Sequence, residues 1–294
     1  MNYKILVYGS LAFDVIFSIP EDFRTSIPLE NGKIRNFNAT YIANEKQEFR
    51  GGTAGNIAFW LGKESIKSSI FSAWGKDFNQ KGYREKLEDL GIKIKGFEGE
   101  FSAHAYIVSD PLHQQLVIWQ PNAYEQNETQ NLSDQFSDED LEGFEYAIFS
   151  PGTPSSLLKH MKEFRKKNKT AIIFFDPGQV APFFEAENFQ KCCILSDVLV
   201  GNDIEFQHFN NYGIPKNMML LETLGGRGVR FIQENKEVFF SAEKVEKVVE
   251  TTGAGDAFRA GVLASLLQKK SWEESIRNGI KLGAKCVKLP SGQE

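Results

Sequence analysis

The stretch TTGAGDAFRAG at residues 251–261 is followed by an apolar pattern of helical period, in which Phe258, Val262 and Leu266 recur four residues apart. A turn of small residues that opens a helix gathers unpaired backbone N–H groups where the helix dipole is positive, which makes an anion site. The carboxylate of Asp256, in the first turn, would lie beside the bound anion. This pairing suits phosphoryl transfer, in which amides hold the moving charge and a base receives the acceptor's proton. The alternative is an ordinary helix start with Asp256 as a first-turn acid.

The composition is typical of a soluble globular protein. At 294 residues, with 41% hydrophobic and 25% charged residues, the chain is long enough for one large α/β domain or two smaller ones. A formal net charge of −5, without a basic stripe, argues against a nucleic-acid partner. No signal peptide or membrane span is evident, and the three cysteines lack a CxxC spacing. We therefore expect a cytoplasmic protein with reduced thiols.

Short apolar runs alternate with helical patterns along most of the chain. Such alternation predicts an α/β fold of three layers in one domain over residues 1–294, with a mostly parallel sheet covered by helices on both faces. Active sites in such folds lie beyond the carboxyl ends of the strands. The expected strands are 4–9, 68–74, 146–150, 171–176, 197–201 and 218–223, and the expected helices are about 54–63, 79–90, 154–168, 202–210, 254–268 and 271–288.

Two segments, at about 15–50 and 103–121, interrupt this alternation. They contain the strand-like pieces VIFSI, NATYIA, AYIVSD and QQLVIWQ, with no helical pattern between them. We expect these pieces to add strands at one edge, as a small β lid over a ligand or as an oligomer contact. Because exposed strand edges can pair, both a monomer and a homodimer formed through the lid remain open.

A second glycine cluster, at residues 51–56, also opens a predicted helix. The chain has no Walker-type phosphate loop, because its Gly-Lys pairs are not followed by Ser or Thr. The adjacent Gly51 and Gly52 permit a close backbone approach and hinge motion. Asn56 would offer both a donor and an acceptor to a substrate hydroxyl. A flexible loop with Asn56 as a helix cap is the alternative.

GGTAGNIA at 51–58, together with TTGAGDAFRAG at 251–261, resembles the paired signatures of the ribokinase-like carbohydrate and nucleoside kinases, the phosphofructokinase B type. The resemblance spans nearly the whole chain in the right order, which makes it far more specific than either motif alone. It includes Asp14 in GSLAFD, AWGKDFNQKGYREKLEDLGI at 73–92, NDIE at 202–205 and TLGGRG at 223–228. The pair Gln114-Gln115, DPGQ at 176–179 and SGQE at 291–294 are similar to the bacterial and archaeal adenosine-kinase-like group.

The resemblance implies a role for each matched position. Asp256 would be the general base, and the N–H groups of Gly253, Ala254 and Gly255 would hold the γ-phosphate. The substrate side would comprise Asp14, Gly51, Gly52, Asn56, Gln115 and Trp119. The indole of Trp119 could stack on a purine, and packing within the core or lid is the alternative. The ATP side would comprise Asn202, Thr223, Gly225 and Gly228, with Glu205 orienting Mg²⁺ through water.

The resemblance implies an ATP-dependent kinase that phosphorylates the 5′-hydroxyl of a nucleoside, with adenosine as the expected nucleoside. A sugar kinase of the fructokinase or ribokinase type is the alternative, and a catalytically silent ligand-binding relative is a third. The silent relative would be expected to lack the base or the loop glycines, and this chain has both. One departure concerns Glu250, where the family usually has Asp, which puts a monovalent-cation site in doubt.

Overall fold

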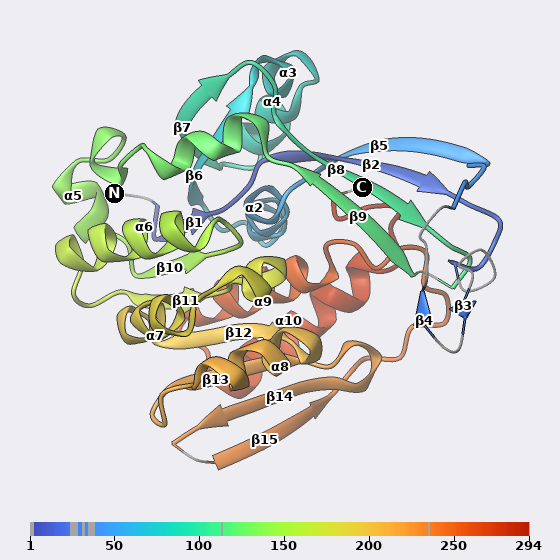
Figure 1. Cartoon of the computed structure of the whole chain (residues 1–294). Helices are drawn as coiled ribbons and strands as arrows, with labels where there is room; N and C mark the ends of the chain where they lie inside the picture. The colour runs from blue at the N-terminus through green and yellow to red at the C-terminus, as the bar shows by residue number, and fades with distance from the viewer. Residues whose placement is uncertain are drawn as a thin grey trace.

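The computed structural model describes residues 3–23, 29–30, 33–34, 39–112, 114–234 and 236–293. Within these residues the largest element is a nine-stranded sheet of order β15-β14-β13-β12-β11-β10-β1-β6-β7, parallel except at β14 and β15 (Figure 1). Its strands are β1 Ile5–Tyr8, β6 Ser68–Gly75, β7 Lys93–Gly99, β10 Tyr146–Phe149, β11 Ile172–Phe175, β12 Val198–Asn202, β13 Met219–Thr223, β14 Gly228–Gln233 and β15 Lys236–Ser241.

Helices cover both faces of this sheet. Alternate side chains of a strand point to opposite faces, so Ile5 and Val7 of β1 enter one apolar cluster and Leu6 and Tyr8 enter the other. The first cluster is closed by α2, α4, α9 and α10, and the second by α5, α6, α7 and α8. The predicted three-layer architecture is thereby confirmed. The helices are α2 Thr53–Lys63, α3 Lys76–Gln80, α4 Tyr83–Asp89, α5 Asp138–Glu142, α6 Pro154–Lys167, α7 Ala186–Leu195, α8 Asp203–Tyr212, α9 Ala254–Leu267 and α10 Trp272–Cys286.

Local signals fix several helix starts. Ser271 caps α10 and exchanges hydrogen bonds with Glu274, and Thr153 caps α6 ahead of a proline at its first position. Short 3₁₀ turns join other elements: η1 Asn122–Glu128, η2 Leu132–Asp134, η3 Gly178–Phe183 and η4 Gly225–Arg227. In the part of the chain that the structure describes, no helix combines the length and apolarity needed to cross a bilayer.

A second sheet, of order β5-β2-β8-β9, forms the predicted lid beside the carboxyl end of β1 (Figure 1). Its strands are β2 Ala12–Ser18, β5 Glu45–Gly51, β8 Ala103–Ser109 and β9 Gln115–Gln120. A two-stranded pair, β3 Leu29–Glu30 and β4 Lys33–Ile34, is a separate small sheet. The remainder of the predicted lid segment, at 24–28, 31–32 and 35–38, lies outside the described residues.

The prediction of a strand at NATYIA was wrong. Its described residues, 39–43, are not in a strand, and the strand is instead β5, whose side chains are mostly polar and exposed. β5 forms a strand because it pairs with β2 along its whole length, and not because its side chains are buried. The apolar Ile42 that suggested a strand is 80% exposed.

The predicted helix at 79–90 was also wrong as one element. The segment forms two short helices, α3 and α4, separated at Lys81 and Gly82. Gly82 has a φ of 65°, a left-handed conformation that ends α3. The polar sequence on either side gave no apolar signal of this break.

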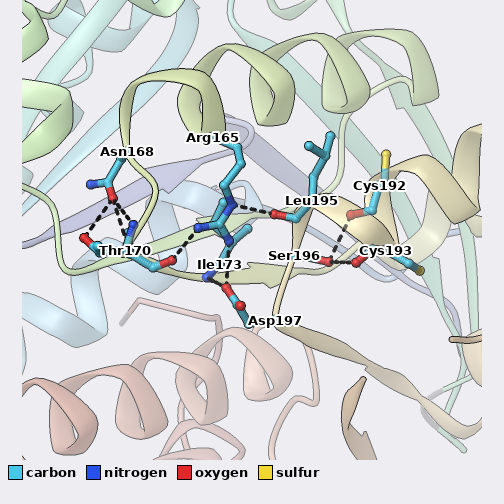
Figure 2. A network of polar contacts seen from close by, with 10 residues as sticks. Arg165, Asn168, Thr170, Ile173, Cys192, Cys193, Leu195, Ser196 and Asp197 are labelled. Atoms are coloured by element: carbon cyan, nitrogen blue, oxygen red, sulfur yellow. Dashed lines mark hydrogen bonds and ion pairs between the residues drawn. The ribbon is translucent and has the colours of Figure 1, made fainter. Parts of the chain in front are cut away.

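The end of the sheet opposite the lid is tied together by polar contacts (Figure 2). Arg165 of α6 donates to the backbone oxygens of Leu195 (3.0 Å) and Ala171 (2.9 Å) and to the carboxylate of Asp197 (2.8 Å). The same carboxylate accepts from the N–H of Ile173, at 2.8 Å. These bonds join the end of α6 to the amino ends of β11 and β12.

Asn168 is expected to matter for stability and not for activity. Its buried carboxamide donates to the oxygens of Leu141 (2.9 Å) and Phe144 (2.8 Å) and accepts from the N–H groups of Thr170 (3.1 Å) and Ala171 (2.8 Å). Asn168→Ala leaves these backbone groups without partners, and it should lower the free energy of unfolding by about 2–4 kcal/mol. Urea unfolding measures this loss. An unchanged stability, or a kcat that falls with the stability intact, would contradict the assignment.

Candidate active site

The glycines of the GAGD loop are required by close approach. Gly253, which caps α9, has a φ of 81°, and a Cβ on it would lie 2.6 Å from the Cα of Gly292. A Cβ on Gly255 would lie 2.6 Å from Nη1 of Arg259. The start of α9 therefore excludes larger side chains, and backbone groups are left to line it.

The N–H groups of this loop differ in their partners. Among the described residues no acceptor is bonded to the N–H of Gly253 or Gly255, whereas Ala254 donates to the carbonyl of Thr251 at 3.2 Å. Two of the three predicted N–H groups are thus available to an anion in this structure. Asp256 follows in the first turn of α9, as predicted.

Asp256 lies among buried charges from three other positions. Arg259, one turn further along α9, donates to Oδ1 of Asp176 at 2.9 Å, and both side chains are buried. Burial raises the pKa of Asp256 to about 7, although the charge of Arg259 and a hydrogen bond from Asn56 oppose the rise. Glu205 and Asp176 raise that pKa further through their charges. A carboxylate with a pKa near neutrality is suited to general-base catalysis.

The residues predicted for the substrate side, Asp14, Gly51 and Gly52, lie where β5 meets β2. The carboxylate of Asp14 occupies the space beside Gly51, because a Cβ on Gly51 would lie 2.1 Å from Oδ2 of Asp14. Gly52 has a φ of 82° and passes close to the carbonyl of Ser10. Burial raises the pKa of Asp14 to about 7, and the charges of Asp256 and Glu250 raise it further. Among the described residues no donor is bonded to the Asp14 carboxylate, which leaves it for a ligand.

Asn56 connects α2 to Asp256 of α9. Its Nδ2 donates to Oδ2 of Asp256 at 2.8 Å, and its Oδ1 accepts from Nε2 of Gln293 at 2.9 Å. Sequence reasoning assigned Asn56 to a sugar hydroxyl and missed these two bonds. Gln293 lies in the quoted SGQE segment, but no local pattern indicates that this segment packs against α2.

The lid contacts the loop that precedes α9. Nε2 of Gln115, the first residue of β9, donates to Oε1 of Glu250 (3.1 Å) and to Oγ1 of Thr252 (3.2 Å). The same oxygen of Glu250 accepts from the N–H groups of Thr251 (2.7 Å) and Thr252 (3.1 Å). Glu250 is therefore occupied in joining the lid to the loop, and its effect on a monovalent cation stays a prediction.

Trp119 lies on the same strand as Gln115. Its ring is 42% exposed and makes an edge contact with Tyr124, with the ring centroids 6.3 Å apart. The indole is thus held at one edge and is accessible to a ligand on the rest of its surface.

The predicted ATP-side residues lie at neighbouring strand ends. Asn202 and Thr223 are paired in register at the carboxyl ends of β12 and β13. Asn202 and Glu205 form a capping box at the start of α8, since each backbone N–H is bonded to the other's side chain at 2.8 Å. This helix-capping role alone accounts for the Asn-x-x-Glu spacing.

The glycines of the following turn have different surroundings. Gly225 has a φ of 57°, and a Cβ on it would meet no atom within 4 Å. Gly228 has a φ of 127°, and a Cβ there would lie 2.0 Å from the carbonyl of Phe240. Gly225 therefore borders open space where a phosphate could approach, whereas Gly228 is needed for the turn into β14.

The residues present fit a hydrated Mg²⁺ and not a protein-ligated one. In the described ranges no group of three or more His, Cys, Asp or Glu side chains is arranged to hold a metal. Oε2 of Glu205 accepts from Asn202, which leaves Oε1 for a water of the ion. Mg²⁺ ordinarily keeps several waters and binds through one or two carboxylates plus substrate phosphates, so a single acid here is sufficient.

The buried Asp14 carboxylate should make stability depend on pH. Its pKa in the folded protein is about 7, against an ordinary value of 3.8. The folded state thus prefers the protonated form, and this stabilisation is complete below about pH 4 and is lost as the pH rises through 7. The free energy of unfolding of Asp14→Asn should therefore be about 1–3 kcal/mol higher than that of the wild type at pH 8. At pH 5 the difference should be much smaller. Urea unfolding at both pH values tests this, and an equal difference at both would contradict it.

Comparisons with known proteins identify the family of this chain. A model of the pfkB family carbohydrate kinases matches residues 7–294. Nucleoside kinases of Methanocaldococcus jannaschii and Thermoplasma acidophilum are 26% and 28% identical to this chain, over 90% and 92% of it and 84% and 85% of the relatives. The structure of Burkholderia thailandensis nucleoside kinase in complex with inosine has a TM-score of 0.85 at 23% identity, covering 98% of this chain and 92% of that one. The chain therefore belongs to the pfkB family of carbohydrate kinases, and it is a phosphotransferase with an alcohol group as acceptor.

Proposed function

We propose that this protein is an ATP-dependent kinase that transfers the γ-phosphoryl group to the 5′-hydroxyl of a nucleoside, with adenosine as its preferred nucleoside. The observation that carries the proposal is a row of side chains across the lid sheet. Asp14 lies opposite Phe49 on β5 and opposite Ala105 on β8, and Ala105 lies opposite Trp119 on β9. Residues directly opposite one another share a face, so a carboxylate and an indole flank a small residue on one surface.

This face of the lid is turned toward the catalytic loop. Gln115 shares a face with Trp119, because the two are four residues apart on one strand, and Gln115 contacts Glu250 and Thr252. Asp14 lies on the same face, and the charge of Asp256 raises its pKa. The polar end of the row suits the hydroxyls of a ribose, and its aromatic end suits a planar base. A free sugar would use only the first of these ends.

The residues then have defined roles in the transfer. Asp256 accepts the proton of the 5′-hydroxyl. At the same time the hydroxyl oxygen forms a bond to the γ-phosphorus, and the bond between that phosphorus and the ADP oxygen breaks. The N–H groups of Gly253 and Gly255 hold the charge on the transferring group. Asp14 accepts hydrogen bonds from the ribose hydroxyls. When bound beside Glu205, Mg²⁺ would neutralise charge on the ATP phosphates.

The names of the relatives support the same acceptor class. Three archaeal relatives are described as nucleoside kinases, and the similar Burkholderia structures are described as complexes with inosine and with ADP-inosine. Other relatives are a putative sugar kinase of Pyrococcus horikoshii and a ribokinase of Haemophilus influenzae. The acceptor must therefore be decided by assay.

Asp256→Asn should lower kcat by a factor of about 10² to 10⁴, because it removes a positioned base. The KM for the nucleoside should change only a few-fold, since the amide keeps the shape of the side chain. Coupled measurement of ADP release tests this. Asp138→Asn makes the same change in the first turn of α5, where it is exposed, and should have no effect. Turnover near that of the wild type in Asp256→Asn would refute the proposed mechanism.

Trp119→Ala should raise the KM for adenosine by about tenfold or more, because stacking on a base contributes about 1–3 kcal/mol. The KM for ATP should stay the same. Leu116→Ala, which removes an exposed side chain from the other face of β9, is the matched control. The wild type is assayed in parallel on a panel of nucleosides and free sugars. A rate with a hexose or ribose and none with nucleosides would establish a sugar kinase, and no rate with any acceptor would favour a silent relative.

A further inference from the structure

A chain of hydrogen bonds runs from the carbonyl of Gly51 to the carboxylate of Asp256. The hydroxyl of Tyr83 donates to that carbonyl at 2.8 Å, and Nε2 of Gln293 donates to the Tyr83 oxygen. The same Nε2 donates to Oδ1 of Asn56 at 2.9 Å, and Nδ2 of Asn56 donates to Oδ2 of Asp256 at 2.8 Å. The three linking side chains are at most 3% exposed, so water does not substitute for any link.

The direction of every bond in this chain follows from its first member. A backbone carbonyl can only accept a hydrogen bond, so the Tyr83 hydroxyl donates its one proton to the carbonyl of Gly51. The Tyr83 oxygen must therefore accept the hydrogen bond from Gln293. Gln293 therefore presents its NH₂ group, which obliges Asn56 to turn its oxygen toward Gln293. The remaining end of the Asn56 amide, its NH₂ group, then faces Asp256. This logic assigns both amides without any need to observe hydrogens.

The backbone around Gln293 is held by separate contacts. The indole N–H of Trp60 donates to the carbonyl of Gly292 at 2.8 Å, and Nζ of Lys86 donates to the carbonyl of Gln293 at 3.1 Å. Gly292 lies against Gly253, the cap of α9. The Gln293 side chain is thus delivered to the site by a fixed segment.

We propose that Tyr83 and Gln293 are positioning residues that fix the orientation of the Asn56 amide, so that the base Asp256 always receives a donor and never faces the amide oxygen. This inference rests on the proposed function, in which Asp256 is the base. Neither residue needs to contact the nucleoside or ATP for this role.

The orientation matters because Asp256 is surrounded mainly by groups that oppose its ionisation. The charged or titratable groups that interact with it are Arg259 on α9, Asp176 after β11, Glu205 on α8, Asp14 on β2, Cys286 on α10 and Tyr83 on α4. Among these described groups Arg259 is the cation. The donor from Asn56 lowers the pKa of Asp256, and a reversed amide would raise it by placing an oxygen against the carboxylate.

Tyr83→Phe carries the test, because it removes the hydroxyl that sets the direction and adds no charge. The measurement is kcat against pH at saturating nucleoside and ATP, which reports the base in the bound enzyme. We expect the acid limb of the profile to move to higher pH by up to about one unit, with the plateau at high pH largely retained. Gln293→Glu cannot donate to Asn56, so its limb should move at least as far in the same direction.

Tyr146→Phe is the matched control. Tyr146 is also buried, and its hydroxyl donates to the carbonyl of Leu266 at 3.1 Å, away from this chain of bonds. Both Tyr→Phe variants lose one buried hydrogen bond, so their unfolding free energies should fall by similar amounts. Only Tyr83→Phe should shift the pH profile, which separates positioning from mere stabilisation.

Two outcomes would overturn the inference. The first is a wild-type acid limb in Tyr83→Phe, whatever its stability, and the second is an equal shift in Tyr146→Phe. Failure of the proposed function is seen separately, as near-normal turnover in Asp256→Asn. If Asp256→Asn is inactive and the Tyr83→Phe profile is unmoved, the base assignment stands and the positioning role is wrong.

Discussion

In the proposed mechanism, the start of α9 must accept a phosphate and keep a carboxylate ionised within one turn of helix. The two demands conflict, because Asp256 repels the anion that the loop N–H groups attract. Arg259, one turn further along the same helix, lies against Gly255 and is paired with Asp176, and its charge opposes the rise in the pKa of Asp256. The small residues of the loop follow from this crowding, since the space that their side chains would fill is occupied by Arg259 and Gly292.

The same constraint explains why the site is costly for stability. Asp14 and Asp256 both have a pKa near 7 because burial disfavours their ionised forms. The charge of Asp256 raises the pKa of Asp14 further, and the charges of Asp176 and Glu205 raise that of Asp256. A protein selected for stability alone would place amides or apolar groups there. The contacts of Arg165 and Asn168 do not carry this stability cost, since they satisfy backbone groups at the other end of the sheet.

The sequence predicted those parts of the structure in which a local rule decides the outcome. Buried parallel strands appear as apolar runs, and glycines such as Gly253 and Gly52 mark places where the backbone must turn or approach closely. It failed where partners decide. β5 is a strand because β2 pairs with it, β15 is largely exposed and is a strand because β14 pairs with it, and Gln293 reaches Asn56 only through packing. The family resemblance brought Asn56 and Asp256 together, and the structure bonds them, yet a pattern of types and spacings carries no information on the direction in which an amide points.

In the proposed mechanism, chemistry and acceptor choice are built on different elements of this fold. The base and the anion loop belong to α9, which is packed into the main sheet, whereas Asp14 and Trp119 belong to a lid whose contact with the loop runs through Gln115 and Glu250. A substitution in the row opposite Asp14 can therefore change the acceptor without disturbing Asp256. This division would explain why relatives of the chain are named both as nucleoside kinases and as a ribokinase, since the proposed catalytic turn is constrained by its own crowding and the lid face is not.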